Sequence, residues 1–118
     1  MSYIDFHTHL LPNIDDGVLK FDQIEEMLDV YSKAGFSKIV CTPHLYNPYV
    51  KTDIANIKDT YLKVKDIALN FGIDLLLGSE YYYLNQSRIV GIPISSKYQL
   101  VELPTTLPQK ILLKSFII

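Results

Sequence analysis

Three histidines and several carboxylates stand at positions where such side chains commonly bind metal ions. His7 and His9 are separated by one residue, so in an extended backbone their side chains project to the same face. His44 follows a proline, and Glu80 and Glu102 come later in the chain. Mixed histidine and carboxylate sites suit Mn²⁺, Zn²⁺ or iron, which polarise phosphoryl or acyl oxygens and lower the pKa of bound water. These residue types therefore favour a metal-dependent hydrolytic site.

Two further carboxylates, Asp15 and Asp16, lie just after the histidine pair, in a segment of turn-forming residues that we expect to be a loop. Each part of this pattern is common without a metal. A lone His-x-His pair, an Asp-Asp-Gly turn and a glutamate at the end of a strand all occur in ordinary structural roles. The conjunction favours a metal site, because every histidine of the chain falls at the end of a predicted strand.

Strand and helix patterns alternate along the chain. Strands are predicted at residues 3–6, 38–42, 73–77 and 98–103, and helices at residues 24–34, 54–68 and 108–118. We expect Gly35 to follow the end of the first helix, Thr52 to cap the second and Gly72 to end it. Such alternation predicts an α/β fold with a parallel sheet, in which catalytic groups gather at the carboxyl ends of the strands.

Composition narrows the functional class. The chain has 118 residues, of which 48% are hydrophobic and 20% charged, which suits one packed domain. Its formal net charge is −2 and its one arginine is Arg88, so nucleic acid is not an expected partner. The apolar stretches are too short to span a bilayer, and we expect no signal peptide. The single cysteine, Cys41, favours a cytoplasmic location.

Other phosphatase and hydrolase arrangements do not fit the sequence. A cysteine phosphatase needs an arginine six residues after its nucleophile, but Asn47 stands six residues after Cys41. The sequence has no glycine-rich phosphate loop and no Gly-x-Ser-x-Gly motif. We therefore expect Cys41 to be a buried strand residue.

Four ordered motifs carry a resemblance to a known group of enzymes. The run from Ile4 to Gly17 (IDFHTHLLPNIDDG) resembles the opening of bacterial capsule-type tyrosine-protein phosphatases, which belong to the polymerase and histidinol phosphatase (PHP) class of metal-dependent phosphoesterases. Thr42-Pro43-His44, Gly78-Ser79-Glu80 and Leu100-Val101-Glu102 match the following motifs in order. The resemblance covers about residues 3–104.

The resemblance implies a fold and a ligand set. The fold would be a parallel-stranded partial (β/α) barrel, the first part of a distorted, TIM-like (β/α)₇ barrel. His7, His9 and Glu80 would act catalytically through a first metal, and Glu80 would bridge to a second that Glu102 also holds. Asp16 and His44 would hold a third, with Asp15 either its neighbour or the true ligand.

The resemblance also implies a reaction and a partner. A metal-activated hydroxide would hydrolyse phosphotyrosine, in a site of up to three manganese ions. The substrate would be the phosphotyrosine tail of a bacterial tyrosine kinase that regulates capsule or exopolysaccharide biosynthesis.

Members of the group are longer than this chain, and their later motifs are expected to be missing from residues 1–118. We therefore expect one truncated domain with impaired activity and an open barrel edge through which copies of the chain can associate. Two alternatives remain: a catalytically dead remnant that binds metal, and a PHP phosphatase for a small phosphate ester such as histidinol phosphate. The Asp-Asp-Gly motif and Glu102 favour the tyrosine-phosphatase branch over the latter. The remnant shares every residue present, so the sequence leaves it open.

Overall fold

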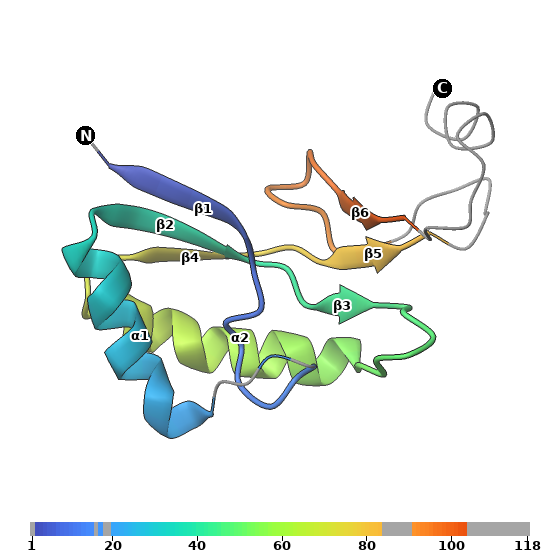
Figure 1. Ribbon diagram of the computed structural model, residues 1–118, viewed down its shortest axis with the longest axis horizontal. Helices are drawn as coiled ribbons and strands as arrows, with labels where there is room; N and C mark the ends of the chain where they lie inside the picture. The colour runs from blue at the N-terminus through green and yellow to red at the C-terminus, as the bar shows by residue number, and fades with distance from the viewer. Residues whose placement is uncertain (1, 16, 18–19, 84–90, 104–118) are drawn as a thin grey trace.

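The computed structural model describes residues 2–15, 17, 20–83 and 91–103, and within these ranges the chain forms two three-stranded sheets and two α-helices. The first sheet has the order β1 (Tyr3–Thr8), β2 (Phe36–Cys41), β4 (Asp74–Leu77). The second has the order β3 (His44–Leu45), β5 (Glu80–Tyr82), β6 (Leu100–Glu102). All neighbouring strands run parallel (Figure 1). The predicted α/β class with parallel strands is confirmed, and the described strands do not close into a barrel.

The second sheet continues the pairing of the first after a short interruption, because β3 follows β2 and β5 follows β4 in the chain. Two residues separate β2 from β3, and two residues separate β4 from β5. Lys38 pairs with Asp74 in the first sheet and His44 pairs with Glu80 in the second, so the sequence offset between partners is unchanged. A 2.8 Å hydrogen bond from the backbone N–H of Glu80 to the carbonyl of Pro43 spans the interruption. The pairing that builds the first sheet therefore also sets the register of His44 against Glu80.

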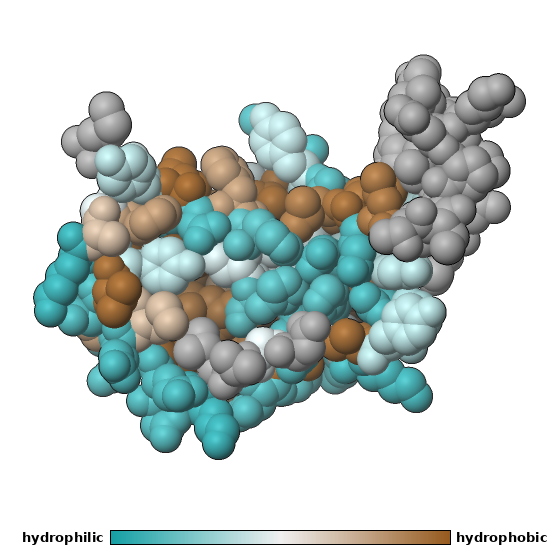
Figure 2. Space-filling model, viewed as in Figure 1, coloured by the Kyte–Doolittle hydropathy of each residue, from teal (hydrophilic) through white to brown (hydrophobic). Residues whose placement is uncertain are grey.

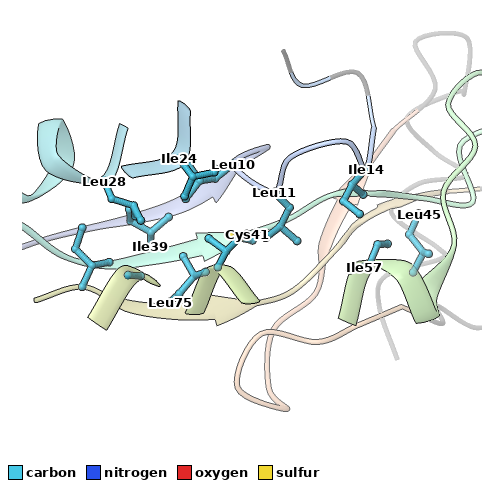
Figure 3. Packing of buried hydrophobic residues seen from close by; sticks show 13 residues of the cluster. Leu10, Leu11, Ile14, Ile24, Leu28, Ile39, Cys41, Leu45, Ile57 and Leu75 are labelled. Carbon is cyan, nitrogen blue, oxygen red and sulfur yellow. The ribbon is translucent and has the colours of Figure 1, made fainter. Parts of the chain in front are cut away.

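Helices α1 (Phe21–Lys33) and α2 (Ile54–Leu69) lie on the same side of the first sheet (Figure 1). Apolar residues at helical spacing turn one face of each helix toward the strands. Ile24 and Leu28 of α1 and Ile57 of α2 are fully buried, and they join Ile39 and Leu75 of the strands in one cluster (Figure 3). Burying a side chain of this size stabilises the fold by about 1.5–3 kcal/mol. This cluster fixes the strands whose ends carry the histidines and glutamates.

The helix ends follow local backbone rules, with one correction. Gly35 follows α1 with φ of 97°, and Gly72 follows α2 with φ of 70°, so both occupy the left-handed region as expected. Thr52, however, does not cap α2. Asp53 is the N-cap and accepts a hydrogen bond from the backbone N–H of Asn56, because a carboxylate one residue later reaches that donor.

The four predicted strands correspond to β1, β2, β4 and β6. The last of them is shorter than predicted, Leu100–Glu102, and belongs to the second sheet. The short strands β3 and β5 were not predicted, because they depend on the pairing of segments that are distant in the sequence. The predicted helix at residues 108–118 lies outside the described residues.

The face of β1 turned away from the helices carries apolar side chains. Asp5 faces α1, where its carboxylate accepts a 2.9 Å hydrogen bond from the hydroxyl of Tyr31. Ile4 and Phe6 alternate with Asp5 and are 44% and 59% exposed. In the view of Figure 2, hydrophobic residues gather along the sheet, whereas the lower surface over the helices is mainly hydrophilic. Neither α1 nor α2, the two helices of the described residues, has the length and hydrophobicity that a membrane span requires.

Candidate metal centre

Five of the six predicted ligands come together at the carboxyl-terminal side of the first sheet. His7 lies near the end of β1 and His9 directly follows it. His44 opens β3, Glu80 opens β5, and Glu102 ends β6. The sixth predicted ligand, Asp16, lies outside the described residues. The parallel order of the strands thus brings together side chains that are up to 95 positions apart in the sequence, as the position of catalytic groups in such folds predicts.

Three imidazole rings surround one carboxylate oxygen. Oε2 of Glu80 lies 3.1 Å from Nε2 of His9, 3.4 Å from Nδ1 of His44 and 4.0 Å from Nε2 of His7. Ligand atoms that share one ion at about 2.0–2.2 Å are separated by about 3–4 Å. His7, His9 and Glu80 therefore form a group with the spacing of a metal site, and they are the residues predicted for the first metal.

The same oxygen of Glu80 is buried and accepts no hydrogen bond within the part of the chain that the structure describes. Leaving a buried charged acceptor without a donor costs at least about 1–3 kcal/mol. A cation bound among the three imidazoles would offset this cost, since neutral imidazoles and a carboxylate are its usual ligands. The residues present therefore fit a divalent metal ion.

His44 connects the first group to a second. Its Nδ1 lies 3.3 Å from Oε1 of Glu102 and 3.4 Å from Oε2 of Glu80. His44 is only 8% exposed and lies between the two glutamates. The side-chain amide of Asn47 donates a 2.9 Å hydrogen bond to Glu102 and orients that carboxylate. His44, Glu80 and Glu102 form the second group able to hold an ion.

Asp15 is the described member of the acidic pair, and its side chain is buried in contact with His9. Its carboxylate accepts hydrogen bonds from Nδ1 of His9 at 2.9 Å, the backbone N–H of His44 at 3.0 Å and that of Gly17 at 3.1 Å. Burial alone would raise the pKa of Asp15, but these hydrogen bonds outweigh it and lower the pKa. An ionised Asp15 accepts the Nδ1 proton of His9 and leaves Nε2 of that ring directed at Glu80.

Asp15 also belongs to a third group with His9 and His44, whose ligand atoms all lie within 4.8 Å of one another. This is the region in which the resemblance implies a third metal. Because the structure does not describe Asp16, both carboxylates of the pair remain candidate ligands.

Sequence reasoning missed the polar residues that hold the ligands. Thr42 contacts His7, and Asn47 contacts Glu102, yet neither was a predicted site residue. The available signal was position, because both lie within three residues of His44 in the segment that leaves β2, and for Thr42 also its place in the Thr42-Pro43-His44 motif. Their partners are distant in the sequence, so the contacts depend on strand pairing.

Cys41 lies away from this chemistry, in the core between the sheet and the helices (Figure 3). Its side chain is fully buried, and burial raises the pKa of the thiol to about 12. A thiol in this state is a poor nucleophile. The expectation that Cys41 is a structural strand residue is confirmed.

Comparison with known sequences identifies the group to which this arrangement belongs. Residues 3–110 match the family described as capsular polysaccharide synthesis, CpsB/CapC. The chain belongs to this family. The match covers every predicted ligand, from His7 to Glu102, and confirms the resemblance drawn from the four motifs.

Two CpsB/CapC relatives show the extent of the similarity. A Streptococcus pneumoniae protein named tyrosine-protein phosphatase CpsB is 30% identical over 107 residues, which cover 84% of this chain and 44% of the relative. A Staphylococcus aureus protein named CapC is 28% identical over 114 residues, covering 86% of this chain and 43% of the relative. The chain thus spans less than half the length of the curated relatives it matches.

Proposed function

We propose that this chain binds divalent metal ions at the carboxyl ends of its strands and, by family resemblance, acts on phosphotyrosine. The observation that carries the proposal is the buried oxygen of Glu80, which faces three imidazole nitrogens and accepts no hydrogen bond from the described residues. The family match and the name of the pneumococcal relative support the reaction class.

His7, His9 and Glu80 would hold one ion, and His44, Glu80 and Glu102 a second. Asp16 with His44 would hold a third, as the resemblance implies. We propose manganese, because nitrogen and oxygen donors without thiolate suit Mn²⁺, although the same donors also bind Zn²⁺ and iron. When bound, such ions supply Lewis-acid polarisation of the phosphoryl oxygen and lower the pKa of the attacking water.

The residues of the chain contribute positioning. Asp15 orients His9, Asn47 orients Glu102, and the hydroxyl of Thr52 donates a 2.6 Å hydrogen bond to the carbonyl of His44. Ligands held in this way lose little freedom when an ion binds. The half-exposed ring of His7 leaves one side of the group open, so a phosphate ester can approach from there.

For the whole protein we propose the phosphotyrosine tail of a bacterial tyrosine kinase as substrate, in the cytoplasm. We also propose that the sheets are part of a (β/α) barrel. The apolar side chains of Ile4 and Phe6, on the face opposite the helices, support a barrel interior there, since bulky apolar residues fill such interiors. In a partial barrel this face would also favour association between copies of the chain.

A metal-binding protein with little turnover is a second candidate, and one observation favours it. The chain has a single arginine, Arg88, so it offers at most one guanidinium to the charge that develops on a phosphoryl group. Losing one donor to the developing charge of a transition state costs about 10²–10³ in rate. We therefore expect the 118-residue chain to bind metal more readily than it turns over substrate.

The test combines calorimetric titration with Mn²⁺ and hydrolysis of a phosphotyrosine peptide. Wild-type chain should bind Mn²⁺, and Glu80→Gln should weaken binding by at least about 10-fold. Losing the hydrogen-bond partner of a metal ligand already weakens binding by about 10–100-fold, and losing the ligand itself costs more. Glu25→Gln, an exposed glutamate on α1, is the matched control and should bind as wild type does. Equal Mn²⁺ affinity for wild type and Glu80→Gln would refute the metal site.

Measuring hydrolysis distinguishes the phosphatase from the metal-binding protein with little turnover. Hydrolysis that needs Mn²⁺ and is lost in Glu80→Gln would support the phosphatase, and binding without hydrolysis would support the metal-binding alternative. Faster hydrolysis of histidinol phosphate than of the phosphopeptide would contradict the tyrosine-phosphatase assignment.

A further inference from the structure

We infer that Thr42 is a positioning residue: its hydroxyl fixes the tautomer and ring orientation of His7 so that Nε2 points toward Glu80. The inference rests on the proposed metal site, but it concerns a residue outside the ligand set. Thr42 is the first residue after β2 and precedes Pro43. Its hydroxyl oxygen lies 2.7 Å from Nδ1 of His7, across 35 positions of sequence.

The hydrogen-bonding capacity of a hydroxyl decides which nitrogen of His7 carries the proton. Thr42 has one O–H donor and two lone pairs. Its O–H donates to the carbonyl of Thr8 at 3.3 Å, and one lone pair accepts the backbone N–H of Thr8 at 3.2 Å. With the O–H assigned to the carbonyl of Thr8, the remaining lone pair faces Nδ1 of His7, and our inference makes Nδ1 the donor of the 2.7 Å contact. Neutral His7 then carries its proton on Nδ1 and presents an unprotonated Nε2, the form that binds a metal.

Burial makes this contact effective. Thr42 is fully buried, and its neighbour Thr8 is anchored by a 2.9 Å hydrogen bond from its own hydroxyl to the carbonyl of Val40. The side chain of His7, in contrast, is 48% exposed. An imidazole with that exposure has access to water on its open side, so the ring needs a fixed partner to hold one orientation. The buried hydroxyl of Thr42 supplies that partner.

The same arrangement occurs at the second histidine with a different partner. Asp15 accepts the Nδ1 proton of His9, and the Nε2 atom of His9 faces Glu80 at 3.1 Å. Thr42 orients His7 through a neutral hydroxyl, and Asp15 orients His9 through a carboxylate. Both rings consequently present Nε2 to the same oxygen of Glu80.

The first test needs no metal. Nitrogen-15 NMR of the imidazole rings in the metal-free chain, at about pH 8.5 where an ordinary histidine is neutral, distinguishes the two tautomers. His7 should carry its proton on Nδ1 in wild type and in Thr42→Ser, which keeps the hydroxyl. Thr42→Val keeps the shape of the side chain but removes the acceptor. In this variant the fraction of His7 that carries its proton on Nε2 should increase. Thr60→Val removes a buried hydroxyl from α2 and should leave the His7 signals unchanged.

The second test measures Mn²⁺ affinity by calorimetry. Thr42→Val should bind Mn²⁺ about 10–100-fold more weakly than wild type, as losses of a ligand's hydrogen-bond partner do, and Thr42→Ser should restore most of the affinity. An unchanged tautomer of His7 in Thr42→Val, or equal affinities of the valine and serine variants, would overturn the inference. Wild-type chain with the Nδ1 proton on His7 but no Mn²⁺ binding would refute the proposed function and uphold the role of Thr42.

Discussion

Replacing Asp15 by asparagine tests whether the buried carboxylate, and not a metal, organises the histidines of the free chain. The side chain of Asp15 is almost fully buried and accepts three hydrogen bonds, from His9 Nδ1 and from the backbone N–H groups of His44 and Gly17. Asparagine has nearly the same shape, but one of its two terminal atoms is a donor. Whichever way the amide turns, at least one of the three N–H groups then faces an N–H₂ group.

The contacts give the size of the effect. If the amide nitrogen takes the place of Oδ1, the contact to Gly17 is lost, and if it takes the place of Oδ2, the contacts to His9 and His44 are lost. A hydrogen bond to a charged group contributes about 1.5–3 kcal/mol. We therefore expect Asp15→Asn to lower the free energy of unfolding by at least about 1.5–3 kcal/mol at neutral pH, measured by urea unfolding of the metal-free chain.

The acid dependence adds a second criterion. Because the pKa of Asp15 is lowered by folding, its charge stabilises the folded chain above the unfolded pKa of 3.8, and this stabilisation is lost as the pH falls through the folded pKa. The difference in the free energy of unfolding between wild type and Asp15→Asn should therefore stay constant from neutral pH down to about pH 5. It should decrease below about pH 4.

The matched control is Asp29→Asn, which removes a half-exposed carboxylate on α1 that pairs with Lys33 at 2.8 Å. Exposed pairs of this kind contribute about 0.3–0.5 kcal/mol, so the control should change stability little. Equal losses for the two variants, or a gap for Asp15→Asn that does not narrow in acid, would refute the reasoning.

Two further predictions concern groups near the first sheet. Burial and the neighbouring Asp5 raise the pKa of Tyr31 from 10.0 to about 12, so its protonated form stabilises the fold below pH 10 and this contribution is lost as the pH rises through about 12. Between pH 10 and 12, the free energy of unfolding measured in urea should therefore fall less for Tyr31→Phe than for wild type. Equal decreases in the two proteins would contradict the raised pKa of Tyr31. The buried thiol of Cys41 should react with Ellman's reagent only as the chain unfolds, whereas rapid reaction in the native state would show that the thiol is accessible.

The longer elements of the fold were predictable because each carries a pattern that local physics imposes. Ile24 and Leu28 lie one helical turn apart and are both buried, and the almost continuous apolar run at 73–77 corresponds to β4 and the residue before it. The strands β3 and β5 were not predictable in this way. They exist because the register of β2 against β4 continues past Pro43, and that register depends on contacts between distant segments.

The ligand types were predictable for a related reason. In a parallel α/β fold the ends of successive strands meet, so a histidine or glutamate at each end was sufficient to predict that they converge. The sequence placed Thr42 and Asn47 close to His44 but did not show their contacts to His7 and Glu102. It also left the role of Asp15 open, and only burial and three donors show that this carboxylate orients His9.

The interruption between β4 and β5 explains how Glu80 is held without a long strand. A Cβ atom on Gly78 would lie 2.5 Å from Cγ1 of Ile94, so only glycine allows that side chain to pack against the backbone here. The next residue, Ser79, accepts a 2.8 Å hydrogen bond from the backbone N–H of Ile92. The residues around 92–94 therefore fix the backbone immediately before Glu80 from one side, while the pairing with His44 fixes it from the other. A ligand held on both sides moves little when an ion binds, which suits the central position of Glu80 in the proposed metal site.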